Sequence, residues 1–207
     1  MIGALATAGC GANPAPPGPA AASSQRPPAP PSASPSPSRQ GIAVPSVAPI
    51  TPQKQQNIYG DLPVYERQVL WKLEDRTLRQ AGANGSLLGS CDQRIDGSAA
   101  VTTTCTITFD GLAVPFSVTA GAGGAYAQWR ATQTSGPLIR TAVHAAWYRY
   151  VSANAPGATG TAMCDARMPE RSLVNFSSPF YECWYTADGA TVVRSVRLTE
   201  AAGVTFA

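Results

Sequence analysis

The chain has 207 residues, five cysteines and a formal net charge of +3. All of that excess lies in the first 60 residues, which hold three basic and no acidic side chains, so residues 61–207 carry twelve charges of each sign. A nucleic-acid-binding domain needs a basic stripe on a folded face. This composition therefore argues against nucleic acid as a partner.

Residues 1–10 resemble the end of a bacterial export signal. A short apolar run leads into the small residues Thr7, Ala8 and Gly9 directly before Cys10, as at a secretory cleavage site. The same four residues resemble a lipobox, in which the cysteine becomes lipidated. The run is short and no basic segment precedes it, so either the true start lies upstream of Met1 or the resemblance is accidental. We expect a lipid on Cys10 to attach the protein to the cell membrane, the alternative being an unstructured terminus with a stray cysteine.

Residues 11–60 have the composition of a disordered tether. The first 60 residues contain thirteen of the nineteen prolines, and a segment rich in Pro, Ala and Ser cannot bury enough apolar surface to fold. Its prolines favour extended conformations at roughly 3 Å per residue, which would give a reach on the order of 100 Å. No run of about eighteen apolar residues occurs in the chain, so no membrane-spanning helix is expected.

One sequence pattern occurs twice in the remainder of the chain. The heptapeptide CTITFDG at residues 105–111 returns as CWYTADG at residues 183–189, and each copy follows a Cys-Asp pair that begins at Cys91 or Cys164. A helix-like stretch with one tryptophan precedes each pair. The pattern predicts two tandem units of the α+β class, each with one helix packed on a small antiparallel β-meander.

The first unit, residues 61–134, begins with a predicted helix over residues 62–80. Asp61 is the expected N-cap, and Gly82 is expected to end the helix. Apolar residues at four-residue spacing predict a buried stripe, with Trp71 at the edge of the core. Alternating apolar residues and the Asp-Gly turn then predict a meander. Its strands are expected over residues 99–109, 112–120 and 125–133.

The second unit, residues 135–207, is expected to repeat this plan. Ser135 is the predicted N-cap of its helix, with Pro137 in the first turn and Asn154 near the end. The final strand is cut short, which predicts a stunted sheet edge with no counterpart of Trp129. The strands are expected over residues 176–186, 190–199 and 204–207.

Four of the cysteines predict two disulfides within the units. Three pairings are open to four cysteines, and the repeat favours Cys91 with Cys105 and Cys164 with Cys183. No Cys-x-x-Cys motif is present, so neither zinc binding nor dithiol redox chemistry is indicated. Each bridge would stabilise a small core by roughly 3 kcal/mol. Because such bridges persist only in oxidising surroundings, they predict a location outside the cytoplasm.

Together these features resemble a small actinobacterial domain of unknown function. The resemblance is carried by the short helix, by Cys91 with the acidic residue after it, and by the Cys105 hairpin with its Asp110-Gly turn. It is closest over residues 62–133 and weaker over residues 137–207, where the loop between the cysteines is longer. That domain recurs in secreted and lipid-anchored proteins behind Pro-rich tethers. The resemblance therefore implies this fold and location, and it supplies no catalytic residues.

The sequence offers little catalytic chemistry. The single histidine, His144, lies off the apolar stripe of its helix, as a surface or boundary residue would. No Gly-x-Ser-x-Gly or His-Glu-x-x-His motif accompanies it. Asp92, Asp96, Asp165 and Glu170 lie in predicted loops, where acids more often hold turns than face each other across a cleft. We expect no enzyme activity, no catalytic residues, no metal site and no cofactor.

The sequence favours a structural or binding role at the cell envelope. Phe176, Phe180 and Trp184 are candidates for an outward-facing surface that meets an unidentified envelope protein or ligand; alternatively they pack against the first unit. Two other roles stay open. A rigid loop at residues 167–171 would suit a secreted protease inhibitor, and a cavity between helix and sheet would suit a carrier of a small apolar ligand.

Overall fold

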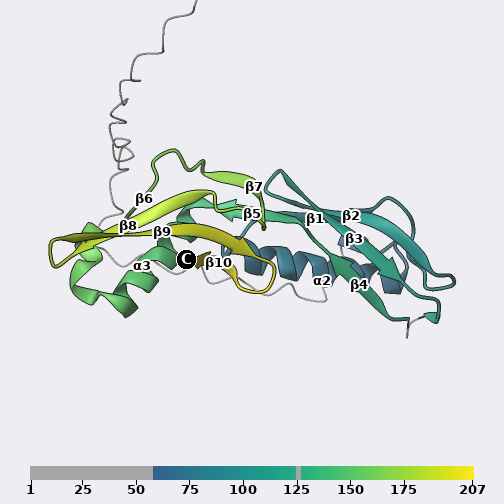
Figure 1. The fold of residues 1–207 in the computed structure, drawn as a ribbon. Helices are drawn as coiled ribbons and strands as arrows, with labels where there is room; N and C mark the ends of the chain where they lie inside the picture. Colours follow the sequence, from purple (N-terminus) through teal and green to yellow (C-terminus); the bar gives the residue numbers. More distant parts are fainter. Residues whose placement is uncertain (1–57, 125–126) are drawn as a thin grey trace, which may run out of the picture. The chain divides into compact units, whose positions relative to one another are not determined.

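Two four-stranded antiparallel sheets account for most of the strands in the described part of the chain (Figure 1). The structure is a computed structural model, and it describes residues 58–124 and 127–207. In chain order its main elements are α2 (Val64–Ala81), β1 (Leu87–Cys91), β2 (Val101–Phe109), β3 (Leu112–Ala120), β4 (Trp129–Thr132), β5 (Ser135–Ile139), α3 (Arg140–Asn154), the 3₁₀ helix η2 (Pro156–Thr161), β6 (Met163–Cys164), β7 (Arg171–Asn175), β8 (Tyr181–Ala187), β9 (Ala190–Thr199) and β10 (Gly203–Phe206). The strand orders are β1-β2-β3-β4 and β10-β9-β8-β6, and β5 pairs with β7 alone. The predicted α+β class is confirmed.

The amphipathic helix α2 lies against the first sheet. It follows Pro63, whose ring holds φ near the helical value. It ends at Gly82, which adopts a left-handed φ of 59° and donates its N–H to the Leu78 carbonyl oxygen at 3.0 Å. The predicted helix is confirmed, but its cap is not. Pro63 takes the N-cap position, so the assignment of that position to Asp61 is wrong.

The first sheet turns alternate side chains of β2 and β3 toward α2. Residues on this face are buried and those on the other face are more exposed, as the two-residue period of a strand requires. The buried set is Thr103, Cys105, Ile107, Phe109, Val114, Phe116, Val118 and Ala120. Asp110 and Gly111 have positive φ angles of 46° and 86°, so the predicted hairpin turn is confirmed.

The edge strand β1 is missing from the sequence-based prediction. Its segment, LLGSC, contains no β-branched residue and therefore carries a weak strand signal. Gly89 fits a close approach to the neighbouring elements: a Cβ there would lie 2.8 Å from Ile107 Cδ1 and 2.9 Å from Leu70 Cδ2. The glycine that weakens the signal is the residue that lets β1 pack beside α2.

Residues 135–139 form the strand β5, so the predicted helix start at Ser135 is wrong. β5 pairs antiparallel with β7, and Pro137 lies opposite Leu173 in that ladder. The helix α3 begins only at Arg140 and ends at Asn154, where its end is predicted. Pairing with a strand that is distant in sequence outweighs the local Ser-x-Pro signal for a helix start.

The strand predicted over residues 176–186 begins too early, since β8 starts only at Tyr181, and the preceding strand β7, which ends at Asn175, is missing from the prediction. A turn separates them, because the Asn175 side-chain oxygen accepts hydrogen bonds from the Ser177 N–H at 3.1 Å and from its hydroxyl at 3.0 Å. Pro179 follows this turn. By contrast, β9 coincides with the predicted strand over residues 190–199, and β10 lies within one residue of the predicted final strand.

The two four-stranded sheets share three local features. In each, the two cysteines of a bridge lie directly opposite each other on neighbouring strands. In each, the aspartate after the first cysteine donates its backbone N–H, at 2.9 Å, to the carbonyl oxygen of the residue before the second cysteine. In each, an Asp-Gly turn with positive φ joins the next two strands. These likenesses are local, and the division into tandem units stays a prediction.

Polar contacts join the two halves of the described chain. Gln80 on α2 and Gln133, between β4 and β5, are both buried and exchange two amide hydrogen bonds of 2.9 Å. The Gln80 amide nitrogen also donates to the Glu200 carbonyl oxygen at 3.2 Å, in the turn between β9 and β10. The bond to the Glu200 carbonyl oxygen crosses between the halves, as does the ion pair of Arg76 with Glu200 at 2.6 Å, so these contacts couple them.

Candidate ligand-binding site

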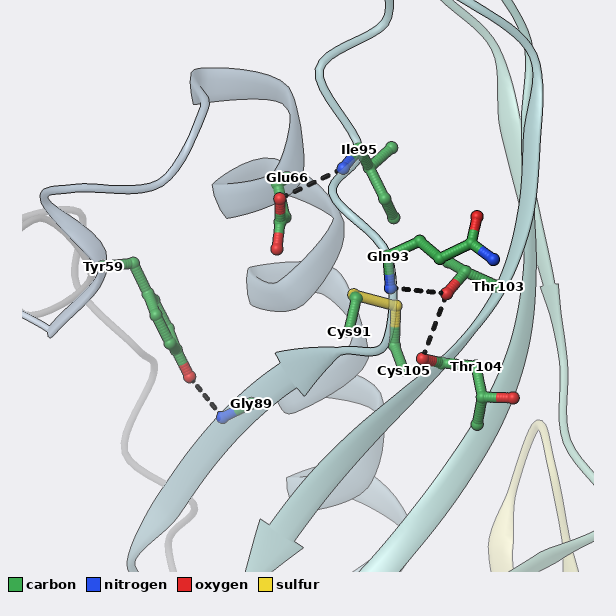
Figure 2. The surroundings of a disulfide bond; sticks show 9 residues. All are labelled: Tyr59, Glu66, Gly89, Cys91, Gln93, Ile95, Thr103, Thr104 and Cys105. Carbon is green, nitrogen blue, oxygen red and sulfur yellow. Dashed lines mark hydrogen bonds between the residues drawn. A yellow bond between two sulfur atoms is a disulfide. The ribbon is translucent and has the colours of Figure 1, made fainter.

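Both predicted disulfides are present, between Cys91 and Cys105 and between Cys164 and Cys183. Figure 2 shows the first bridge at the end of β1, where the chain turns back toward α2. There the buried Glu66 carboxylate accepts the Ile95 N–H at 3.1 Å. The cysteine expected to carry a lipid, at position 10, lies outside the described residues.

A buried carboxylate lies beside the second disulfide. The side chain of Asp165 is 5% exposed and forms an ion pair with Arg167. It accepts hydrogen bonds from Arg167 Nη2 at 2.7 Å, from Nε at 3.0 Å and from the backbone N–H at 2.9 Å. The side-chain hydrogen bonds from Arg167 hold the pKa of the Asp165 carboxyl below its usual value. Asp92, which follows the first cysteine of the other bridge, is exposed.

Replacing Asp165 by asparagine is expected to lower the free energy of unfolding at pH 7 by about 1 kcal/mol, because charged hydrogen bonds to a largely exposed arginine are lost. A carboxyl whose folded pKa is depressed stabilises the fold above its unfolded pKa of about 4, and this contribution disappears as pH falls through the folded pKa. The difference in the free energy of unfolding between wild type and variant should therefore disappear below about pH 4. Urea unfolding at pH 7 and at lower pH measures it, with Asp92→Asn as the matched control. If this difference in the free energy of unfolding stayed constant with pH, the stabilising role of the Asp165 carboxylate would be contradicted.

The other titratable side chains singled out from the sequence do not converge. Asp96 is exposed, and its hydrogen bonds from Ser98 lower the pKa of its carboxyl. Glu170 lies 3.4 Å from Arg140 in an ion pair. His144 is half-buried, and its Nε2 has no hydrogen-bond partner among the described residues. Burial, together with the charge of Arg140, lowers the pKa of this imidazole. Within the described ranges, no group of three His, Cys, Asp or Glu side chains is placed to hold a metal ion.

The segment at residues 167–171 lacks the form of an inhibitor loop. Such a loop has to be extended and exposed, but Met168 is 1% exposed and belongs to the second core. Its N–H donates to the Asp165 carbonyl oxygen at 3.2 Å, which closes a turn. Arg171 already belongs to β7. The geometry therefore gives no support to the protease-inhibitor alternative.

Of the three aromatic residues in the predicted partner surface, two pack against the second core. Phe176 and Phe180 are half-buried in contact with that core. Phe176 also covers Gly136, since an added Cβ there would lie 2.9 Å from its Cε1. Trp184 lies on the other face of β8 from the buried Cys183. A partner at these residues stays a prediction, and Trp184 is the one of the three that does not pack against the core.

Trp184 belongs to an apolar row across the second sheet. Its direct cross-strand partners are Met163 on β6 and Val193 on β9, and Val193 is 45% exposed. The row at the same place in the first sheet, one residue past the second cysteine of the bridge, consists of small or polar residues. It is made of Ser90, Thr106 and Pro115.

A hollow of about 400 Å³, the α2–β4 pocket, has two tryptophan walls. Trp71 comes from α2 and Trp129 from the edge strand β4, and both are half-buried. The other lining residues are polar or basic and lie on the same face of α2. They are Gln68, Lys72, Arg76 and Arg79. The volume lies within the range of roughly 300–1,000 Å³ that is typical of ligand sites.

Two hydrogen bonds from α2 hold β4 on either side of Trp129. The Tyr65 hydroxyl donates to the Ala127 carbonyl oxygen at 2.7 Å. Arg76 Nη1 reaches the Ala131 carbonyl oxygen at 3.5 Å. Since β4 has only one neighbouring strand, these bonds add to its pairing with β3 in holding the Trp129 indole beside the helix.

The basic side chains of the pocket are partly neutralised. Arg76 forms an ion pair with Glu200 at 2.6 Å, and Arg79 forms one with Asp75. The Lys72 ammonium lies 4.9 Å from the centre of the Trp71 ring in a cation–π contact. Lys72 has no carboxylate partner among the ion pairs of the described residues. Three cations and two carboxylates leave an excess of one positive charge.

In the second half of the chain, an aromatic ring of the last strand packs against the helix tryptophan. Ala131 of β4 pairs with Val118, whereas Phe206 of β10 occupies the same place opposite Val196. The Phe206 ring centre lies 4.9 Å from that of Trp147, which is 2% exposed.

The fold and the site define a disulfide-bonded α+β protein with an aromatic, weakly basic pocket. No protein-family model matches the chain, and neither a curated protein nor a solved structure is significantly similar to it. The resemblance to the actinobacterial domain thus stays a prediction. No helix in the described ranges is long and apolar enough to cross a membrane.

Proposed function

We propose that this chain is an exported protein of the cell envelope that binds a ligand in the α2–β4 pocket without transforming it. The observation that carries the proposal is a pair of disulfides, one in each of two separate cores. Such bridges indicate an oxidising location outside the cytoplasm. The pocket supports the binding role, because it combines two aromatic walls with a polar rim, as ligand sites do.

Attachment and spacing are the parts of the proposal that rest on the sequence. A lipid on Cys10 would hold the chain at the membrane, and the residues between Cys10 and position 58 would act as the spacer. The predicted tether over residues 11–60 extends too far, because Tyr59 is buried in the first core. Units 61–134 and 135–207 would be tandem copies of one module, and their shared bridge and turn geometry supports this interpretation. The first copy would carry the open pocket, and the second would carry the apolar row around Trp184.

The intact mass of the protein, purified from the membrane fraction of its own cells, tests the proposal. Alkylation is carried out with and without prior reduction. We expect a chain that begins at Cys10 with a diacylglyceryl increment, and four cysteines that react only after reduction. A Cys10→Ser variant should leave the membrane fraction and keep its four protected cysteines. An unprocessed chain with five free thiols would overturn the proposal.

A further inference from the structure

We infer that the ligand of the α2–β4 pocket is an acidic glycan, a chain of pyranose rings that carries carboxylate or phosphate groups. The inference rests on the proposed function, because only an exported protein meets the glycans of the envelope. The two indoles suggest a ligand with rings, and the basic face of α2 suggests a ligand with acidic groups. Each component can be tested by itself.

The indoles offer flat apolar faces to a ring. Trp71 and Trp129 are half-buried and line the same hollow, although they come from different elements. The electron-rich face of Trp71 already attracts a cation, the Lys72 ammonium at 4.9 Å. The C–H groups on one face of a pyranose carry a weak positive polarisation and pack on an indole in the same way. Gln68 at the rim can both donate and accept a hydrogen bond, which suits sugar hydroxyls.

The charge of the pocket suits a sparsely charged ligand. Two of its three cations are paired with Asp75 and Glu200, so one positive charge, near the exposed Lys72, remains for the ligand. Nucleic acids, whose backbone bears a phosphate at every nucleotide, are bound by several unpaired Lys and Arg side chains. A glycan with one acid group per ring or per few rings matches this excess better.

Binding of defined probes by the full, disulfide-bonded chain tests the inference. The probes are an oligogalacturonate, which has carboxylated pyranose rings, a neutral maltooligosaccharide, inorganic polyphosphate and a single-stranded oligonucleotide. We expect titration calorimetry to show the tightest binding for the oligogalacturonate. Trp71→Ala and Trp129→Ala should each weaken it about tenfold or more. Tyr148→Ala, at a half-buried aromatic residue that does not line the pocket, is the matched control, and it should leave the affinity unchanged.

Lys72→Glu separates charge from folding, because Lys72 is exposed on the surface of α2. We expect it to weaken oligogalacturonate binding about tenfold and to leave maltooligosaccharide binding unchanged. Equal affinity for the neutral probe would overturn the acidic part of the inference, and preference for polyphosphate or the oligonucleotide would overturn the glycan part. Absence of binding by any glycan, with a lipidated chain and four protected cysteines, would overturn the ligand class and leave export intact.

Discussion

Replacing Cys164 and Cys183 together by alanine is expected to lower the free energy of unfolding by about 3 kcal/mol. The bridge joins residues 19 apart in the sequence, and closing a loop of that length restricts the unfolded chain by about this amount in the chain-entropy account. Removal of the other bridge, with a separation of 14, should cost nearly the same, because the entropy depends only on the logarithm of loop length. Urea unfolding followed by tryptophan fluorescence measures both variants.

The number of unfolding transitions tests how the two halves are coupled. Because Gln80 donates to the Glu200 carbonyl oxygen and Arg76 pairs with the Glu200 carboxylate across the junction, we expect each variant to unfold in one transition at a lower urea concentration. Separate transitions would show that the halves unfold independently. If the free energy of unfolding fell by less than about 1 kcal/mol in both variants, the bridges would not be the main restriction on the unfolded chain. The reduced wild-type protein should have the same free energy of unfolding as a variant in which all four cysteines are replaced.

The bridges and the hairpin turns could be predicted because their signals are local in sequence. Cys105 and Asp110 occur in a short pattern that repeats, and an Asp-Gly pair favours the positive φ angles that both turns adopt. β5 could not be predicted, since Ser135 and Pro137 have the form of a helix start. Its conformation is decided by pairing with β7, a contact that no local pattern records.

The pocket could be predicted only in part. The basic and polar residues of α2 recur at spacings of three and four, so their common face follows from the sequence. Trp71 was expected at the edge of the core, and it is half-buried there. Nothing in the sequence places Trp129 beside it, because the position of β4 depends on its pairing with β3 and on contacts from α2 that are distant in sequence.

Replacing Tyr59 by phenylalanine is expected to lower the free energy of unfolding by about 3 kcal/mol, because one hydroxyl forms hydrogen bonds with two buried groups. The Tyr59 hydroxyl donates to Glu74 Oε1 at 2.5 Å and accepts the Gly89 N–H at 2.5 Å (Figure 2 shows the second bond). Both side chains and the glycine are buried. Burial, reinforced by the hydrogen bond to Glu74, raises the pKa of the Tyr59 phenol, so the phenol stays protonated and keeps donating.

The cost follows from the position of β1 at the edge of its sheet. Without the hydroxyl, the Gly89 N–H loses its acceptor and Glu74 loses a donor to Oε1, and each loss carries a desolvation penalty of about 1–3 kcal/mol. Hydrogen exchange at the Gly89 amide should accelerate together with the loss of stability measured by urea unfolding.

Tyr65→Phe is the matched control, because it removes the same atom from a buried tyrosine six residues further along the chain. The Tyr65 hydroxyl makes one bond, to the Ala127 carbonyl oxygen at 2.7 Å, in a partly buried place. A single neutral hydrogen bond of this kind contributes about 1 kcal/mol. If Tyr59→Phe cost no more than Tyr65→Phe, the Tyr59 hydroxyl would not be the link between Glu74 and β1, and water would have to satisfy those groups instead.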